Sequence, residues 1–360
     1  MKLTAILNLA FILIFNQSLF SQQYLSLSDE SVSRITDLVL IYQGGTHRPD
    51  WTQDDFKPYV YREDGEGKPE WLFDGFLFIE FKDNEGHEYA HGYKQQPAGK
   101  LQWRWLLERN FEKDRAIQAL NLLLDSLENA GFSPARKRKV VLTLPEPIIN
   151  FTEWGKLNGK DLDFSRADDR YKACQWYIDL ALMYWDQMGL EHLELAGFYW
   201  VAEQSGESTG LLPEVFDYIA GKGMKFFWIP YWNAVGAGDW KQSGFDGAYQ
   251  QPNHFFSTDT PDERLDEACR FAGQHGMGME FEFDPRVNNP EFRERFYKYV
   301  EAYKTYGIWD SVAVAYYEGG IGVMKCSQSN IPEVKKVYDD LADIITDRQK
   351  KADVIYITIK

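Results

Sequence analysis

Three carboxylates alternate with large apolar residues in the segment 276–284, which reads Gly-Met-Gly-Met-Glu-Phe-Glu-Phe-Asp. In an extended strand, Glu280, Glu282 and Asp284 lie on one face, and the apolar side chains lie on the other. A solvated strand shows the same alternation. If the charged face points into a protein interior instead, three ionised carboxylates are costly to bury unless they take part in chemistry. The segment is therefore the first candidate for a catalytic strand.

A further carboxylate, Glu203, follows the apolar run Leu193–Val201. Two carboxylates that flank a cleft the size of a sugar can hydrolyse a glycosidic bond: one protonates the leaving oxygen, and the other attacks the anomeric carbon or activates water. This chemistry requires neither a metal ion nor a cofactor, and we expect neither here. Glu282 is the preferred nucleophile or base because it lies nearer the end of its strand, and Glu280 is the alternative.

The elements that must position these carboxylates follow a regular order. Amphipathic helices separate most of eight strand candidates, which lie at Asp37–Gly44, Gly75–Phe81, Lys139–Pro145, Leu193–Val201, Met224–Trp232, Gly244–Gln251, Gly276–Asp284 and Ser311–Glu318. Alternating strands and helices predict a parallel sheet with right-handed crossovers, and eight repeats predict closure into a single (β/α)₈ barrel of the TIM type. In such a barrel, the strand face that points away from the helices lines the interior.

Two connections depart from the repeat. The segment Gly45–Asp74 shows no clear helix, and Asn233–Ser243 is too short to hold one. The tail Asp353–Lys360 could form a short edge strand. A Rossmann-type sheet is the alternative architecture, but no glycine-rich phosphate fingerprint follows the first strand. We therefore expect one barrel domain over residues 23–360, with irregular connections between strands one and two and between strands five and six.

An active site in a parallel barrel forms at the carboxyl ends of the strands. Beside the carboxylates, we expect substrate-binding residues at or after these ends: His47, Arg48, Tyr199, Trp232, Tyr249, Asn253, His254, Asp284, Tyr316 and Glu318. Structural roles remain open for several of them. Tyr249, Trp232 and Tyr316 could fill the core, and Asp284, which precedes a proline, could cap the following turn.

Four stretches carry a resemblance to a known family: Trp71–Phe78, Gly197–Trp200, Gly244–Asn253 and Met279–Glu282. They resemble a secreted bacterial family of unknown function within the glycosidase-superfamily TIM barrels, and the resemblance covers most of the chain. It implies a barrel that acts on carbohydrate. It also implies that Glu203 is the acid/base and that Glu280 or Glu282 is the nucleophile. The large retaining clan of that superfamily has Asn before its acid/base, whereas this chain has Ala202.

The N-terminal segment of the chain indicates export. Lys2 precedes an apolar run from Leu3 to Phe15, and polar residues follow, which is typical of a secretory signal peptide over residues 1–22. This run is too short for a comfortable membrane span, and no later segment is long and apolar enough for one. The net charge of −16 argues against nucleic acid as a partner. We expect a secreted or periplasmic protein, and the sequence leaves its oligomeric state open.

These observations predict an exported glycoside hydrolase that acts on an oligo- or polysaccharide. Aromatic residues make up 16% of the chain, which suits stacking against sugar rings but also suits core filling. A barrel that binds carbohydrate without cleaving it is the alternative, motivated by Ala202. A third hypothesis is a metal-assisted enzyme with Glu280, Glu282 and Asp284 as oxygen ligands.

Overall fold

The computed structural model describes residues 23–45 and 47–359, so the predicted signal peptide lies outside the described residues. Eight parallel strands close into a barrel, in which each strand pairs with its neighbours and the last strand pairs with the first. In chain order they are β1 (Asp37–Tyr42), β4 (Gly75–Ile79), β7 (Arg138–Leu144), β10 (Leu193–Trp200), β11 (Lys225–Trp228), β12 (Gly247–Gln250), β13 (Gly278–Glu282) and β14 (Val314–Tyr317). The predicted barrel is confirmed, and each observed strand overlaps its predicted segment.

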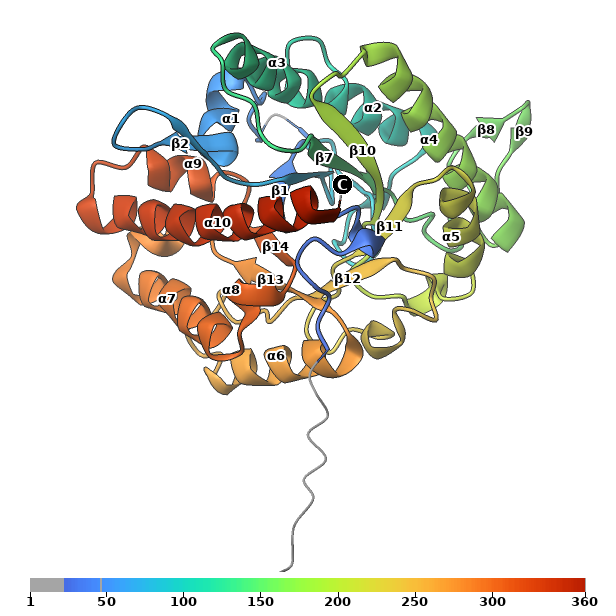
Figure 1. Ribbon diagram of the computed structural model, residues 1–360. Coiled ribbons are helices and arrows are strands. Elements are labelled where there is room, and N and C mark those ends of the chain that lie inside the picture. The colour runs from blue at the N-terminus through green and yellow to red at the C-terminus, as the bar shows by residue number, and fades with distance from the viewer. Residues whose placement is uncertain (1–22, 46, 360) are drawn as a thin grey trace, which may run out of the picture.

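Helices surround the barrel and bury their apolar faces against it (Figure 1). They are α1 (Gln53–Val60), α2 (Lys100–Asn110), α3 (Ala116–Asn129), α4 (Ala167–Met188), α5 (Leu212–Gly221), α6 (Glu263–His275), α7 (Pro290–Thr305), α8 (Ile308–Ser311), α9 (Gly322–Ser327) and α10 (Pro332–Ile359). The face of α3 illustrates the spacing, because Ile117, Leu120 and Leu124 recur at helical intervals and are buried. Three small two-stranded sheets decorate the loops: β2–β3 (Tyr61–Glu63, Pro69–Trp71), β5–β6 (His87–Glu88, Gln96–Pro97) and β8–β9 (Lys156–Leu157, Lys160–Asp161).

The connection between the first two barrel strands contains a helix that the sequence analysis did not predict. In α1, the Thr52 side chain accepts a hydrogen bond from the backbone N–H of Asp55, whose side chain bonds back to the N–H of Thr52. This capping box starts a helix of only eight residues with Pro58 inside it, so its periodicity is weak. Between β11 and β12 there is only the short 3₁₀ turn Ala237–Asp239, as the length of that connection predicted.

The lower end of the barrel, where the strands begin, is closed by two segments. Val32 and Ile35 of the N-terminal segment are buried against two glycines at strand starts. A Cβ atom on Gly247 would lie 2.1 Å from Val32 Cγ1, and one on Gly75 would lie 2.5 Å from Ile35 Cγ2. Glycine is therefore required at these two positions, because any side chain there would clash with Val32 or Ile35.

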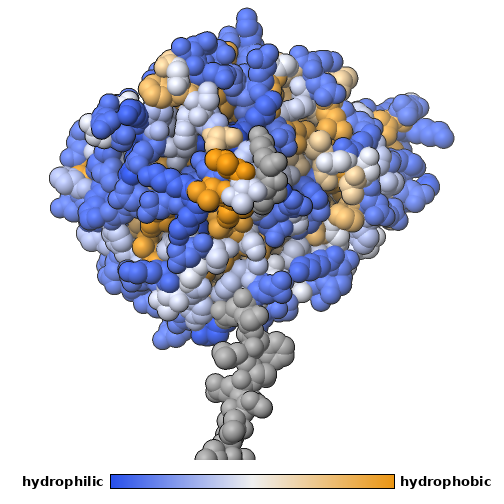
Figure 2. All heavy atoms as spheres, viewed as in Figure 1, coloured by the Kyte–Doolittle hydropathy of each residue, from blue (hydrophilic) through white to orange (hydrophobic). Residues whose placement is uncertain are grey.

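The second closing segment is α10, which crosses the barrel opening in Figure 1. Its Arg348 is 1% exposed and donates to Asp37 Oδ1 at the start of β1 at 2.6 Å, and Arg136 joins Asp353 of the same helix to Asp74. The predicted edge strand over 353–360 is therefore wrong, because the tail continues this helix. Figure 2 shows an apolar patch near the end of α10, where Val354 and Ile357 are exposed.

Two further observations bear on the expected environment of the chain. Cys174, Cys269 and Cys326 are buried free thiols. Within 23–45 and 47–359, no helix is long and apolar enough to cross a membrane.

Candidate active site

A cavity of about 310 Å³ opens at the carboxyl ends of the strands, where a barrel enzyme carries its catalytic groups. Glu203, which follows β10, and Glu280, on β13, both line it. We call this cavity the inner lobe. Its lining consists of Leu40, Tyr42, Arg48, Glu80, Phe81, Lys82, Tyr93, Tyr199, Glu203, Gln251, Asn253, Phe256, Glu280 and Tyr317.

Glu203 is held by two side chains from different loops. Gln251 Nε2 donates to Glu203 Oε1 at 2.8 Å, and the Tyr93 hydroxyl lies 3.5 Å from Oε2. Burial raises the pKa of the Glu203 carboxyl to about 7, and the bonds from Gln251 and Tyr93 oppose that rise. A carboxyl group that titrates near neutral pH and faces a cavity is suited to donating a proton.

Glu280 is the second carboxylate of the inner lobe. Glu280 is 2% exposed. Among the described residues, its carboxylate has no hydrogen-bond partner. Burial, then the negative charges of Glu282 and Glu203, raise the pKa of this carboxyl well above its ordinary value. A buried carboxylate with no protein partner is costly, so it is a candidate for a group that interacts with a ligand.

Glu282 occupies the same strand face but belongs to a different environment. It accepts hydrogen bonds from the backbone N–H groups of Asn253 and His254, at 3.2 and 3.3 Å, and from the Tyr299 hydroxyl. Burial raises its pKa to about 8, and these three bonds oppose the rise. Glu282 does not line the inner lobe. The structure therefore places Glu280, and not the preferred Glu282, in the cavity with Glu203.

An ion pair forms one wall of the inner lobe. Arg48 Nε and Nη2 donate to the two oxygens of Glu80 at 2.8 and 3.1 Å, and the guanidinium lies 4.4 Å from the centre of the Tyr42 ring. Tyr317 packs edge-on against Tyr42. This wall combines an aromatic surface with fixed polar groups, which is suited to binding a sugar ring and its hydroxyls.

A second cavity, of about 510 Å³, adjoins the inner lobe and shares Glu203 and Tyr93 with it. We call it the outer lobe. Its lining consists of Ala90, His91, Gly92, Tyr93, Glu146, Ile148, Ile149, Ala202, Glu203, Gln204, Ser205, Gly206, Glu207 and Tyr231. Glu203 and Tyr93 therefore lie between the two lobes.

Of the residues predicted at the site, Glu203, Glu280, Tyr199, Asn253 and Arg48 meet in the inner lobe. The other predicted residues do not line either lobe: Glu282, His47, Trp232, Tyr249, His254, Asp284, Tyr316 and Glu318.

Two of these side chains, those of Tyr249 and Tyr316, lie nearer the start of the strands than either lobe. The Tyr316 hydroxyl donates to Asp37 Oδ1, at the start of β1, at 2.7 Å. Tyr249 packs against Gly278, at the start of β13, where a Cβ atom would lie 2.6 Å from its ring. Both tyrosines fill the lower core, which was the structural alternative for them.

Glu318 and His254 form hydrogen bonds within the protein and do not line either lobe. Glu318 is fully buried and accepts from the Tyr59 hydroxyl and the Val323 N–H, each at 2.9 Å, and burial raises its pKa to about 8. His254 is likewise buried, with its Nε2 2.9 Å from Asp262 Oδ1. Both side chains therefore serve the packing of the loops around the cleft.

The remaining predicted residues lie at the edge of the cleft or beyond it. Asp284 caps the short 3₁₀ turn Pro285–Asn288 and pairs with Arg286, so it is not available beside Glu280 and Glu282 as a metal ligand. The backbone N–H of Trp232 donates to Asn253 Oδ1 at 2.6 Å, and the indole ring of Trp232 packs against the Arg264 guanidinium. His47 is exposed.

Several lining residues were missed by sequence reasoning. Tyr93 lies in a long loop between β4 and α2 that has no periodic pattern, so no sequence signal places it beside Glu203. Gln251 and Glu80 follow β12 and β4 directly, and their positions at strand ends could have identified them.

Two sequence motifs known from hydrolases also occur in the chain. His87-Glu-Tyr-Ala-His91 has the spacing of a zinc protease motif, but it lies in β5 and the loop after it, so its histidines do not share a helix face. Gly206-Glu-Ser-Thr-Gly210 matches the nucleophile-elbow pattern, but it forms a 3₁₀ turn and not a strand-to-helix elbow. Ser208 in this turn is buried and donates to Glu146 Oε1 at 2.7 Å. Neither motif has the geometry of its chemistry.

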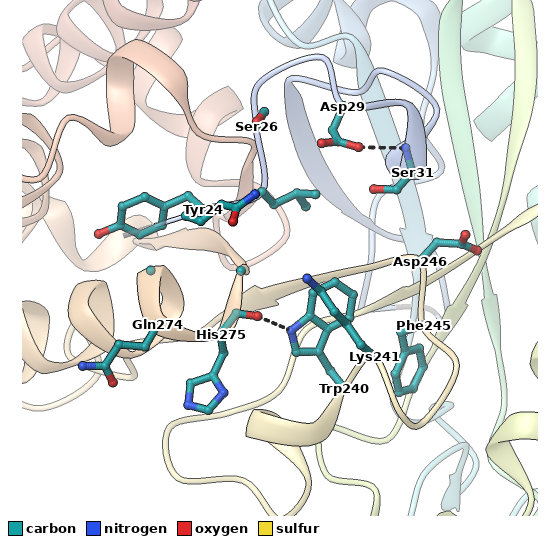
Figure 3. A pocket seen from close by; sticks show the side chains of 14 residues that line it. Tyr24, Ser26, Asp29, Ser31, Trp240, Lys241, Phe245, Asp246, Gln274 and His275 are labelled. Carbon is teal, nitrogen blue, oxygen red and sulfur yellow. Dashed lines mark hydrogen bonds between the residues drawn. The ribbon is translucent and has the colours of Figure 1, made fainter. Parts of the chain in front are cut away.

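A larger cavity, of about 960 Å³, lies at the opposite end of the barrel (Figure 3). Its lining includes Asp246 and Gly276, which precede β12 and β13, so it is at the end where the strands begin. The Trp240 indole donates to the His275 carbonyl, and Asp29 accepts from the Ser31 N–H (Figure 3). Active sites of this fold form at the other end, and we assign no chemistry to this cavity.

The sequence matches one family model, and the structure is similar to several solved structures. The model of a domain of unknown function, DUF4855, matches residues 37–343. No curated protein matches the chain. A proposed alpha-L-fucosidase from Bacteroides thetaiotaomicron is 12% identical, with a TM-score of 0.45, over 86% of this chain and 94% of its own.

Two other similar structures have different activities. Tryptophan synthase subunit alpha from Legionella pneumophila is 10% identical, with a TM-score of 0.42, over 91% of this chain and 99% of its own. An intracellular xylanase from Thermoanaerobacterium saccharolyticum is 12% identical, with a TM-score of 0.36, over 77% of this chain and 89% of its own. Similarities this low assign no activity.

Proposed function

The chain belongs to the DUF4855 family of domains of unknown function, and we propose that it is a glycoside hydrolase in which Glu203 and Glu280 are the two catalytic carboxyl groups. The observation that supports this proposal best is their placement. Both line one cavity at the carboxyl ends of the strands, and Glu280 has no hydrogen-bond partner among the described residues. A pair of carboxyl groups on either side of a sugar is sufficient for this reaction.

In this proposal, Glu203 is the general acid. Its pKa of about 7 leaves a large fraction protonated at neutral pH, and Gln251 and Tyr93 fix the orientation of the carboxyl group toward the cavity. The proton passes from Glu203 to the glycosidic oxygen as the bond to the anomeric carbon breaks. Protonation of Glu203 also removes one of the negative charges that oppose ionisation of Glu280.

Glu280, once ionised, either attacks the anomeric carbon or removes a proton from the attacking water. The positive charge that develops at the anomeric carbon in the transition state favours the carboxylate form of Glu280, which offsets the cost of burying it. Glu282 is a positioning residue in this scheme. Its bonds to two backbone N–H groups and to Tyr299 fix the loop after β12, which supplies Gln251 and Asn253 to the inner lobe.

The test is hydrolysis of plant, algal and host glycans by purified protein and by single Glu→Gln variants. We expect Glu203→Gln and Glu280→Gln each to lose about 10²-fold or more in kcat, the range for removing an acid–base catalyst. Glu214→Gln is the matched control, because Glu214 is an exposed residue on α5 that lines neither lobe. Full activity in the Glu203 or the Glu280 variant would overturn the assignment.

The two roles can be separated with an external nucleophile. If the mechanism is retaining, azide restores turnover in Glu203→Ala and Glu280→Ala and gives glycosyl azides of opposite anomeric configuration. If the mechanism is inverting, Glu203→Ala accumulates no covalent glycosyl-enzyme intermediate and gives no azide product of retained configuration.

A barrel that binds carbohydrate without cleaving it is the second candidate, and Ala202 favours it. An Asn at that position would add a polar group beside Glu203, whereas the alanine side chain provides none. Binding alone predicts unchanged glycan affinity in Glu203→Gln and Glu280→Gln and no release of sugar by the unmodified protein. We also propose export with removal of residues 1–22, which N-terminal sequencing of the protein recovered outside the cytoplasm would test.

A further inference from the structure

We infer that the outer lobe binds a sugar residue on the leaving-group side of Glu203, and that this sugar is uncharged. The substrate is then an oligo- or polysaccharide with at least one neutral sugar beyond the bond that is cleaved. The inference rests on the proposed function, because it takes Glu203 as the group that protonates the leaving oxygen.

The first argument is the position of Glu203 between two cavities. Glu203 and Tyr93 line both the inner and the outer lobe, and each of the other lining residues belongs to one lobe. An acid that protonates a glycosidic oxygen lies between the two groups which that oxygen joins. Glu280 lines only the inner lobe, so the sugar whose anomeric carbon reacts lies there. The outer lobe is therefore on the leaving-group side.

The second argument is the size and rigidity of the outer lobe. Its volume of about 510 Å³ falls within the range of about 300–1,000 Å³ that small-molecule sites occupy. Its polar groups are fixed in advance: Glu146 accepts from the Ser208 hydroxyl and the His91 N–H, and the Tyr231 hydroxyl donates to Gln204 at 2.9 Å. Fixed donors and acceptors beside Ile148 and Ile149 are suited to a ring that carries hydroxyl groups.

The third argument is charge. Glu146 and Glu207 line the outer lobe beside the proton donor Glu203, and no lysine or arginine belongs to its lining. Arg170 lies behind this wall, where it donates to the carbonyl of Glu207. A uronate or a sulfated sugar would meet these carboxylates with no cation to pair with, whereas a neutral sugar avoids that repulsion. The outer lobe therefore selects against anionic residues on the leaving-group side.

Binding to the inactive variant Glu203→Gln tests occupancy of the outer lobe directly. Calorimetry would measure affinities for cello-, xylo-, manno- and galacto-tetraose and for tetragalacturonate, with and without the added substitution Ile149→Trp, which fills the lobe. We expect at least one neutral tetrasaccharide to bind and to lose about tenfold in affinity with Ile149→Trp. Val354→Trp is the control, since Val354 is exposed on α10 and lines neither lobe, and it should leave affinity unchanged.

A second comparison uses the active protein with Ile149→Trp. Hydrolysis of the tetrasaccharide should lose about tenfold in kcat/KM, while a 4-nitrophenyl glycoside of the same sugar, whose phenol needs no sugar subsite, should change less than about twofold. Equal effects on both substrates, or none on either, would overturn the inference. Glu207→Lys tests the charge argument: it should raise the ratio of tetragalacturonate to neutral tetrasaccharide affinity, and an unchanged ratio would refute selection by charge.

The failure of each proposal has its own signature. If the protein binds a tetrasaccharide with the expected response to Ile149→Trp but releases no sugar, hydrolysis is refuted and the sugar site in the outer lobe stands. If hydrolysis occurs and Ile149→Trp affects both substrates alike, the outer lobe is refuted and hydrolysis stands. If no glycan binds, both are refuted.

Discussion

Replacing Glu203 by glutamine should stabilise the protein at alkaline pH. Burial raises the pKa of this carboxyl from its ordinary value of 4.5 to about 7. A group whose pKa is higher in the folded state binds protons more tightly there, so its favourable contribution is complete below pH 4.5 and is lost as the pH rises through 7. The full loss is about 3 kcal/mol, since each pKa unit corresponds to about 1.4 kcal/mol.

The measurable part lies between pH 5.5 and pH 8.5. Over that interval, a single group with these two pKa values changes the free energy of unfolding by about 2 kcal/mol. The change should be smaller for Glu203, because this residue is partly exposed to solvent. The advantage of Glu203→Gln over the unmodified protein should therefore grow by about 1–2 kcal/mol as the pH rises. The glutamine keeps one oxygen to accept the bond from Gln251, so the geometry is largely preserved.

Urea unfolding followed by tryptophan fluorescence and by circular dichroism at both pH values would measure the difference. The matched control is Glu207→Gln, which removes an exposed carboxylate from the same loop and should change stability by less than about 0.5 kcal/mol at either pH. A Glu203→Gln effect that is equal at pH 5.5 and 8.5, or that becomes more destabilising as the pH rises, would refute a raised pKa at this position.

Three further results are expected. Tyr299→Phe removes a hydrogen-bond donor to the buried Glu282 and should lower the free energy of unfolding by about 1–3 kcal/mol, measured by urea unfolding. The loss should be larger at pH 8.5 than at pH 5.5, because the ionised carboxylate depends more on that bond. A loss that does not change with pH would contradict this. Arg348→Met leaves Asp37 buried without its cation and should cost about 3–5 kcal/mol, whereas Lys351→Met, which breaks an exposed pair with Asp310, should cost less than about 1 kcal/mol. Hydrolysis should persist after exhaustive chelation, because Asp284 pairs with Arg286 instead of joining Glu280 and Glu282 around an ion; loss of activity that added metal restores would contradict the carboxylate mechanism.

The strands were predictable because barrel strands are buried on both faces and read as short apolar runs between turn residues. The helix α1 was not, because its eight residues include Pro58 and its start depends on a capping box. The prediction of a strand in the C-terminal tail was wrong for a different reason. Val354, Ile355 and Ile357 favour a strand, but these residues continue a long helix, whose Arg348 and Asp353 pair with Asp37 and Arg136 at the barrel opening.

The candidate site was partly predictable, since the alternation on β13 placed Glu280 and Glu282 on one face of the strand. Choosing between them required knowledge of tertiary contacts. Position along the strand favoured Glu282, but Tyr299 on α7 and two N–H groups after β12 hold that carboxylate outside the inner lobe. The positions of Tyr249 and Tyr316 also could not be predicted from alternation alone. Alternation indicates that a side chain points inward, but not how far along the barrel axis it lies.

The bond between Asp37 and Arg348 joins residues that are 311 positions apart in the chain. During synthesis, β1 emerges early, and its buried carboxylate gains its cation only after α10 has followed the whole barrel. Contacts between such distant residues slow folding, so the nascent chain remains open for most of its translation. The family match ends at residue 343, before Arg348 and Asp353. A protein shortened to those bounds would retain every strand of the barrel and lose the helix end that completes its assembly.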